Sequence, residues 1–295
     1  MKKPLFINLT LLAVVIVLVL LIWFDPFATP QPEPSPLTRE DAGDVNQISL
    51  TRRGHLEFSL QRIRQPQTGE LRWYLKSPLE MPANPDKVAG ILGLLGTNSF
   101  RQYHIKSDNL AKLGLQPPAW EMRLGDTVVK FGKTEPIGQK RFVLVKDTVH
   151  LINDQYSQYS FGSPLMLANL DILPVDKSVT ELHLPDKVIK KVDGQWQSTP
   201  ATDTIPQNTY KELIDQWRYA QALRVALADK TDQSGFISDA KAVTVFLEKA
   251  EQPVHFTIEA NEQNVIITNK DWGVRYYLTP AVGEKLLQLQ SPTHE

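Results

Sequence analysis

Two hydrophobic patterns divide this chain. Residues Leu5 to Phe24 form an almost continuous apolar run, whereas beyond about Ile48 apolar and polar residues alternate in short segments. About 20 helical residues at 1.5 Å each match the roughly 30 Å hydrocarbon core of a bilayer, so the run predicts one transmembrane helix. Lys2 and Lys3 are the only charges before it, which predicts a cytoplasmic N-terminus and an exported remainder.

A cleaved signal peptide is the alternative to a permanent anchor. Its apolar region is usually about 7 to 15 residues long and ends in a small-x-small motif. Here the run is longer, and Pro26 lies where a cut after Ala28 would need a small residue. We therefore expect an uncleaved anchor within residues 1–25. The absence of cysteine excludes a lipoprotein anchor.

Prolines at positions 26, 30, 32, 34 and 36 follow the apolar run. Such spacing favours extended polyproline II, which rises about 3.1 Å per residue. Residues 26–47 are therefore expected to form a proline-rich spacer. An unstructured tether is the alternative.

The first alternating region, residues 48–176, predicts strands around one amphipathic helix. Asn84-Pro85 is a typical helix start, and Val88, Ile91, Leu92 and Leu95 follow at helical spacing. A further helix is expected over Leu165–Leu173. The expected strands are Leu56–Leu60, Leu71–Leu75, Trp120–Leu124, Thr127–Phe131, Arg141–Val145 and Thr148–Ile152.

The second region, residues 177–295, shows the same order of elements. A strand at Gln195–Gln197 precedes a helix whose apolar face is Tyr210, Leu213, Ile214 and Trp217. A final helix is expected over Ala281–Leu289. The expected strands between the two helices are Val243–Leu247, Val254–Ile258, Val265–Ile267 and Val274–Leu278.

The two regions also match at the level of residues. Trp73 and Trp196 are 123 positions apart, and the four apolar helix positions shift by 122. Arg141–Leu144 resembles Arg275–Leu278 at a shift of 134. These matches predict an α+β protein in which an N-terminal transmembrane helix precedes two tandem antiparallel-β repeats, each with a packed helix. Two unrelated α+β segments with coincident spacing are the alternative.

Composition narrows the functional classes. The chain carries a formal net charge of −1, and the exported part without Lys2 and Lys3 carries −3. Nucleic-acid binders usually show a clear basic excess, so this class is not expected. Because cysteine is absent, disulfides, thiolate metal sites and cysteine nucleophiles are excluded.

A tryptophan-containing strand that ends in proline, followed by a helix and Leu113-Gly114-Leu115-x-Pro117, resembles the domain of unknown function 4340 family. The hairpin Gly125-x-Thr127-Val128-x-x-Phe131-Gly132 belongs to the same resemblance, which extends from about Ile48 to Leu289. The resemblance implies a single-pass, membrane-anchored bacterial envelope protein. Some members are encoded beside components of ATP-binding-cassette transporters related to gliding-motility systems. The family has no established catalytic residue.

Residues that could support catalysis form no recognisable motif. The histidines lack zinc-site spacing, and neither a nucleophile elbow nor a phosphate-binding loop is present. Acidic loop residues are typical of turns, although a convergent carboxylate pair would serve a hydrolase. We therefore expect no catalytic, cofactor-binding or metal-binding residue and no cofactor. The residues considered are His55, His104, His150, His183, His255, His294, Asp108, Asp126, Asp147, Asp154 and Glu135.

Tryptophans could line a sugar-binding groove, but core packing is the expectation for Trp120, Trp196 and Trp217. Trp272 lies in the turn Asn269–Gly273, so it is expected to be exposed and is a possible partner contact. The sequence thus predicts a non-enzymatic interaction or accessory component of an envelope assembly or ATP-binding-cassette-type transporter. Its location would be the bacterial inner membrane, with the C-terminal domain periplasmic or extracytoplasmic. The expected partners are the membrane, through Leu5 to Phe24, and an envelope protein, but no nucleic acid. A periplasmic glycan- or peptide-binding module and a hydrolase are the alternatives.

Overall fold

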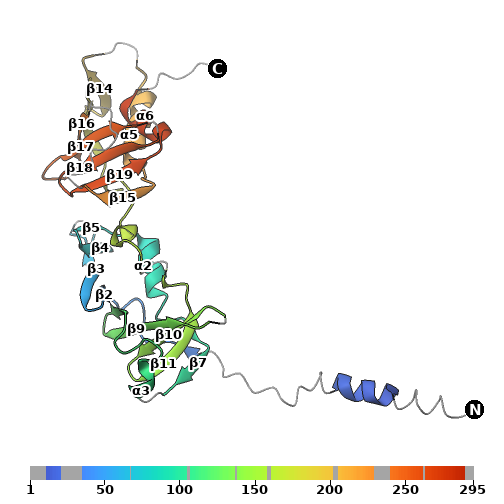
Figure 1. The fold of residues 1–295 in the computed structure, drawn as a ribbon. Helices are drawn as coiled ribbons and strands as arrows, with labels where there is room; N and C mark the ends of the chain where they lie inside the picture. Colours follow the sequence, from blue (N-terminus) through green and yellow to red (C-terminus); the bar gives the residue numbers. More distant parts are fainter. Residues whose placement is uncertain are drawn as a thin grey trace, which may run out of the picture. The chain divides into compact units, whose positions relative to one another are not determined.

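A computed structural model describes residues 11–20, 35–66, 68–104, 107–136, 138–157, 161–201, 205–228, 240–261 and 263–289 of the chain (Figure 1). The chain divides into two units, Met1–Ser35 and Pro36–Glu295. Each unit is described by itself below.

In the first unit, residues 11–20 form an α-helix. Its leucine, isoleucine and valine side chains are between 48% and 60% exposed, so no face of this helix is packed. No helix among the described residues is long and apolar enough to span a membrane. The two ends of the predicted span, residues 5–10 and 21–24, and residues 26–34 of the predicted spacer lie outside the described residues.

The described residues of the second unit form two large antiparallel sheets, and the first has nine strands in the order β5-β4-β3-β2-β8-β9-β10-β11-β7. This sheet includes every strand predicted for residues 48–176. It also includes β2 and the short β5 and β7, which were not predicted from the sequence pattern. The strands are β2 (Gln47–Arg52), β3 (His55–Arg64), β4 (Leu71–Ser77), β5 (Met81–Pro82), β7 (Arg101–Tyr103), β8 (Trp120–Leu124), β9 (Thr127–Thr134), β10 (Lys140–Val145) and β11 (Thr148–Asn153), with the short β1 (Ser35–Pro36) and β6 (Asn98–Ser99) outside this sheet.

The second sheet has eight strands among the described residues, in the order β14-β13-β12-β16-β17-β18-β19-β15. Its strands are β12 (Val179–His183), β13 (Val188–Val192), β14 (Gln195–Thr199), β15 (Arg224–Leu227), β16 (Lys241–Leu247), β17 (Val254–Ala260), β18 (Val265–Asn269) and β19 (Val274–Leu278). The sequence pattern predicted five of these strands but missed β12, β13 and β15. The fold is therefore α+β with antiparallel sheets.

The helices follow the predicted apolar faces. In α2 (Pro85–Leu92), the Asn84 side chain accepts hydrogen bonds from the backbone N–H groups of Asp86 and Lys87, and Val88 and Ile91 are buried. The longer α5 (Gln207–Tyr219) buries the four residues expected from its spacing. The final helix, α6 (Pro280–Leu287), lies close to its predicted range. The described residues also include a short helix, α3 (Ser107–Leu110), and a 3₁₀ turn, η1 (Pro164–Leu167).

The predicted helix over Leu165–Leu173 is wrong beyond η1. Ala168 adopts an extended conformation, and the following backbone groups pair with other segments instead of with one another. Asn169 N–H donates to Pro82 O over 2.9 Å, and Ile172 N–H donates to Ala220 O over 3.1 Å. Local apolar spacing cannot reveal such long-range partners.

The predicted spacer also ends earlier than expected. Leu37 and Val45 are buried in the core, and Leu37 N–H donates to Thr97 O over 2.8 Å. The second unit accordingly starts at Pro36, before the predicted boundary at Ile48. Apolar residues placed singly among polar ones gave no periodic pattern, so the sequence did not reveal this packing.

The two sheets share one strand order. In the first sheet, eight neighbouring strands have the order β4-β3-β2-β8-β9-β10-β11-β7. This order corresponds, strand by strand, to β14-β13-β12-β16-β17-β18-β19-β15 in the second sheet. Trp73 and Trp196 lie in the equivalent strands β4 and β14. Arg141–Leu144, however, lies in β10 and Arg275–Leu278 in β19, and these strands hold different places in the two orders. The match at a shift of 134 therefore paired two strands that are not equivalent. The error arose because neighbouring strands of one sheet have the same alternating pattern, so either strand resembles β10.

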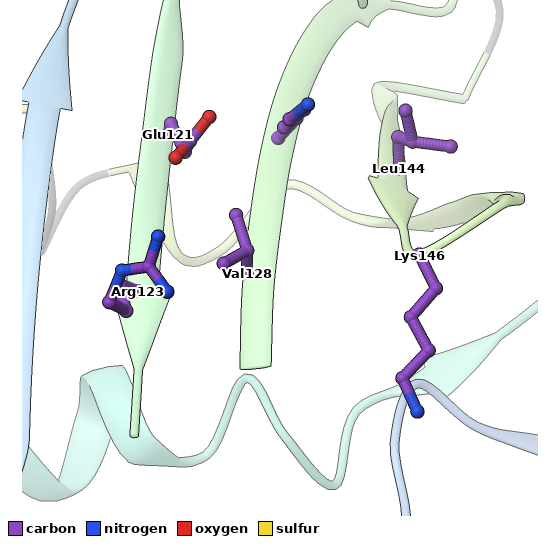
Figure 2. Close-up of a pocket in the computed structure, with 6 residues that line it drawn as sticks. Glu121, Arg123, Val128, Leu144 and Lys146 are labelled. Atoms are coloured by element: carbon purple, nitrogen blue, oxygen red, sulfur yellow. The ribbon is translucent and has the colours of Figure 1, made fainter. Parts of the chain in front are cut away.

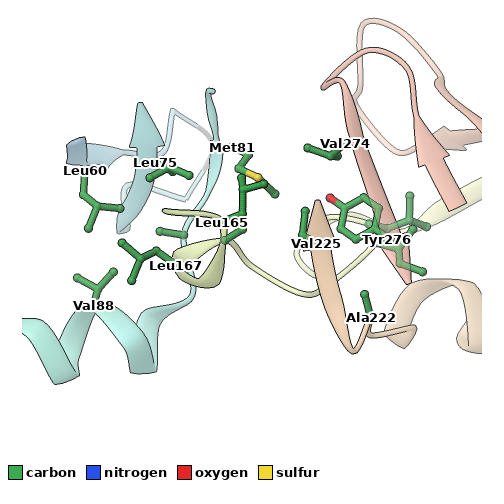
Figure 3. Close-up of a cluster of buried hydrophobic side chains, with 14 of the residues drawn as sticks. Leu60, Leu75, Met81, Val88, Leu165, Leu167, Ala222, Val225, Val274 and Tyr276 are labelled. Atoms are coloured by element: carbon green, nitrogen blue, oxygen red, sulfur yellow. The ribbon is translucent and has the colours of Figure 1, made fainter. Parts of the chain in front are cut away.

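Buried side chains from both sheets belong to one hydrophobic cluster. Leu75 and Met81 come from the first sheet, Leu165 from η1, and Val225 and Tyr276 from the second sheet (Figure 3). The second unit is thus held by a continuous core.

Candidate binding face of the first sheet

The central strands of the first sheet have one buried and one accessible face. Leu50, Met122 and Val129 are directly opposite one another on β2, β8 and β9, and all three are fully buried. The next residues along these strands point to the other face because strand side chains alternate. We call that side the outer face; it carries Thr51, Glu121, Lys130 and Leu144 in one row across β2, β8, β9 and β10.

The loop that follows α3 covers part of the outer face. Leu115 from this loop packs with Leu144 of β10 and Val149 of β11 in a small hydrophobic cluster separate from the main core. Leu110 and Leu113 are partly buried against the same cluster. The loop after α3 therefore lies over the outer face of β10 and β11.

The glycines of the two family motifs allow this loop to dock. A Cβ atom on Gly132 would lie 2.5 Å from the Leu113 carbonyl oxygen, so no other residue fits without a shift. Next to it, Lys133 N–H donates to the same oxygen over 2.8 Å. Gly114 has a φ of +71°, a left-handed conformation that glycine adopts without strain. The motif glycines thus have a structural role.

Two hollows lie on the part of the outer face near β8 and β9. The smaller has a volume of about 280 Å³ and the larger about 950 Å³, and Glu121 lines both. Figure 2 shows side chains from β8, β9 and the end of β10 around the smaller hollow. The smaller hollow is lined by Glu121, Arg123, Val128, Lys130, Leu144 and Lys146, and the larger by Thr51, Arg53, Gly54, Gly114, Pro117, Pro118, Ala119, Glu121, Phe131, Gly132 and Lys133.

Positive charge dominates these hollows. Their linings include Arg53, Arg123, Lys130, Lys133 and Lys146, against the single carboxylate of Glu121. None of these five cations forms an ion pair with a described residue, judged by a nitrogen–oxygen distance of 4.0 Å or less. We call the two hollows and these six charged residues the cationic face. It contrasts with the net charge of −1 for the whole chain.

Arg141 behaves differently from the cations of this face. Its guanidinium donates to both carboxylate oxygens of Asp154, over 2.8 and 2.7 Å, and to the Gly132 carbonyl oxygen over 2.7 Å. Arg141 and Asp154 are each 18% exposed. A charge pair of this geometry fixes the end of β9 beside the larger hollow.

Among the other residues considered from the sequence, His150 packs inside the fold, whereas His55, His104 and His255 are exposed. The ring of His150 is buried and its Nδ1 lies 3.1 Å from Ser99 Oγ. Burial, together with the nearby charge of His104, lowers the pKa of His150. His294 and the side chain of Asp108 lie outside the described residues. Within the described ranges, no group of three or more histidine and acidic side chains is arranged to hold a metal ion.

The tryptophans are engaged with other side chains. Trp120 stacks on Phe161 with ring centroids 4.6 Å apart and lies 5.0 Å from the Arg52 guanidinium. Trp217 is fully buried, and its Nε1–H donates to Leu286 O over 2.8 Å. Trp196 is also buried.

Trp272 is half-buried, so it is less exposed than its position in a turn led us to expect. The buried Asn269 side chain accepts hydrogen bonds from the N–H groups of Asp271 and Trp272, each over 3.0 Å, and this holds the turn against the core. Trp272 also lines a cavity of about 20 Å³ with Met81 and Tyr276. Its role as a partner contact stays a prediction.

Sequence reasoning missed the cationic face because its residues come from several strands and a distant loop. A partial signal exists in Glu121-x-Arg123 on β8, where charged residues occupy alternate positions, and in Lys130, which lies opposite Glu121 on β9. Only the sheet order shows that β2 and the loop after α3 border the same hollow.

The comparisons with known proteins agree with the fold-defining motifs. The family described as Domain of unknown function (DUF4340) matches residues 73–252, more than half of the chain. Searches among curated proteins and among solved structures gave no match. The matched region includes α2, the loop after α3 and β8 to β11. The chain therefore belongs to the DUF4340 family.

Proposed function

We propose that the protein is a membrane-anchored extracytoplasmic component that acts by non-covalent contact in an envelope assembly or an ATP-binding-cassette-type transporter. The observation that carries this proposal is the cationic face, where five cations without ion pairs to described residues surround two hollows. Unpaired charge in a concave surface is suited to recognition of a partner.

The exposed apolar helix at residues 11–20 supports the membrane anchor. A helix that is hydrophobic on all sides is stable where apolar surroundings cover every face, as in a bilayer. The apolar sequence continues on both sides of these residues, from Leu5 to Phe24. With Lys2 and Lys3 on the cytoplasmic side, the second unit would be exported.

Tethering would make even a weak interface effective. A protein held at the membrane searches for its partner near one surface, which raises the effective concentration of the pair. Trp272 is a second proposed contact because part of its ring remains accessible. No catalytic step is part of this proposal.

We also propose that the second unit arose by internal duplication. The shared strand order supports this origin, as does the shift of 122 residues between the buried faces of α2 and α5. The two halves would then be copies of one α+β repeat that later diverged.

Membrane fractionation and a C-terminal phosphatase fusion test the anchor. The full chain should sediment with membranes, and a phosphatase that requires export should be active when fused after Glu295. Val15→Lys combined with Leu18→Lys should abolish membrane retention, because each central lysine costs about 2.5–3.5 kcal/mol on insertion. Val15→Leu combined with Leu18→Val is the matched control and should remain in the membrane. An inactive fusion, or unmodified protein in the soluble fraction, would contradict the anchored topology.

A further inference from the structure

We propose that the cationic face binds an extended acidic segment of a partner polypeptide. This inference rests on the proposed function and names the chemical class of the partner. The charges of the two hollows, their shape and the position of Glu121 each bear on the choice of ligand.

The positive charge of the two hollows is complementary to a negatively charged ligand. The smaller hollow is lined by Arg123, Lys130 and Lys146, and the larger by Arg53 and Lys133. Arg123, Lys146, Arg53 and Lys133 are exposed, so their ammonium and guanidinium groups can reach a bound anion. Carboxylates of a ligand would gain charge-assisted hydrogen bonds from these donors.

The shape of the two hollows favours an extended ligand. The two hollows have Glu121 in common, so they adjoin along the outer faces of β8 and β9. Pro117, Pro118 and Ala119 give the larger hollow an apolar side that can pack against the aliphatic parts of a peptide. An extended chain can follow adjoining hollows, whereas a flat bilayer surface cannot enter them.

The Glu121 carboxylate lies where the two hollows adjoin. Glu121 would repel a ligand with continuous negative charge, such as an array of lipid phosphates. A peptide has backbone N–H groups between its acidic side chains, and these can donate to the Glu121 carboxylate. The mixture of five cations and one anion therefore favours a polypeptide over a uniform polyanion.

The second sheet provides an internal comparison. The buried pair Leu50–Met122 of the first sheet is equivalent to the buried pair Leu182–Val245 of the second sheet. With these pairs aligned, the positions of Glu121, Arg123 and Lys130 on β8 and β9 are occupied on β16 and β17 by Thr244, Phe246 and His255. The Phe246 ring there contacts the ring of His183, with centroids 4.9 Å apart. The charge pattern on β8 and β9 is thus a property of the first sheet and not a requirement of the shared strand order.

The experiment measures binding of a fluorescent octaglutamate peptide to the full chain in a neutral detergent. Octaglutamate should bind, and its affinity should fall as salt is added because exposed charges are screened. Arg123→Glu combined with Lys130→Glu should weaken binding by about tenfold or more. Lys191→Glu combined with Lys285→Glu changes the net charge equally at exposed positions outside the face and should leave binding within about twofold.

Two further measurements make the outcome decisive. Thermal unfolding should show that the Arg123 and Lys130 variant remains folded, and Arg123→Gln with Lys130→Gln provides a milder substitution for the same binding assay. Vesicles of anionic phosphatidylglycerol are the other probe. Equal loss of peptide binding in both double charge reversals, no peptide binding at all, or vesicle binding without peptide binding would overturn the inference. Membrane retention of the same variants reports separately on the anchor, so failure of this inference and failure of the proposed anchor are distinguishable.

Discussion

Gly132 shows how a single missing side chain shapes the cationic face. The Leu113 carbonyl oxygen occupies the place of its Cβ atom, and the Leu115 side chain lies 3.0 Å from the same position. Backbone of the loop after α3 can therefore rest directly on β9. The interpretation of the family motifs as structural follows from this contact.

Gly132→Ala should lower the free energy of unfolding by about 1–3 kcal/mol, because the added methyl group forces the loop away from β9. Urea denaturation of the full chain in detergent measures this change. Gly96→Ala is a suitable control, since no atom lies within 4 Å of the added Cβ and the backbone there does not require a positive φ. Equal unfolding curves for the two variants would contradict this account of Gly132.

The buried ring of His150 predicts a dependence of stability on pH. Because burial lowers its pKa in the folded state, the unfolded chain binds a proton more readily. Stability should be greatest above the unfolded value of about 6.5 and should fall as the pH drops through the lowered pKa of the folded state. His150→Gln should reduce this loss in unfolding experiments between about pH 8 and pH 5. Identical pH profiles for His150→Gln and the unmodified chain would disprove the role of His150.

At the scale of elements, the two sheets close equivalent edges in different ways. In the first sheet, β5 pairs with β4, and Ala83 N–H donates to Trp73 O over 2.9 Å. In the second sheet, the Gln207 carboxamide accepts from Trp196 N–H over 2.9 Å and donates to Trp196 O over 2.7 Å. A side chain of α5 thus satisfies the backbone groups of the edge strand β14.

Gln207→Ala should expose the backbone N–H and C=O of Trp196 at this edge. The loss of two hydrogen bonds should cost about 1–3 kcal/mol, and the open edge should favour pairing with another chain. Sedimentation velocity over a range of concentrations measures the association. Gln195→Ala on the same strand is the control, because its exposed side chain forms no hydrogen bond with a described residue. An unchanged mass and an unchanged free energy of unfolding for Gln207→Ala would show that this contact does not protect the edge.

Elements with a strong local pattern were predictable from the sequence. Most strands with alternating apolar residues, and the helices with an apolar face, α2 and α5, were identified correctly, because burial of one face imposes the period. The strand β2 was missed, although Ile48 and Leu50 alternate with polar residues in it. Short edge strands such as β5, β7 and β15 lack enough residues to show a period. The segment after η1 was wrongly predicted as a helix because its apolar residues are buried through contacts distant in the sequence.

At the scale of the whole molecule, the family and the α+β class were predictable, but the cationic face was not. The formal net charge of the whole chain is only −1, so composition does not reveal the local excess of positive charge on the cationic face. Arg53 and Lys133 are 80 positions apart in the chain and line one hollow only because β2 and β8 are neighbours in the sheet. Net charge per chain is therefore a poor guide to a surface that several strands assemble.

The docking of the loop after α3 has a consequence for how this fold can diversify. Its closest contact with β9 joins the Leu113 carbonyl oxygen to the position of Gly132, whereas the charges beside it are on side chains of the outer face. Under the proposed function, mutations at Arg123 or Lys130 would alter which partner is bound with little effect on folding, while the loop and its glycines must be retained. Under the same proposal, the partner that is recognised could change while the scaffold is kept.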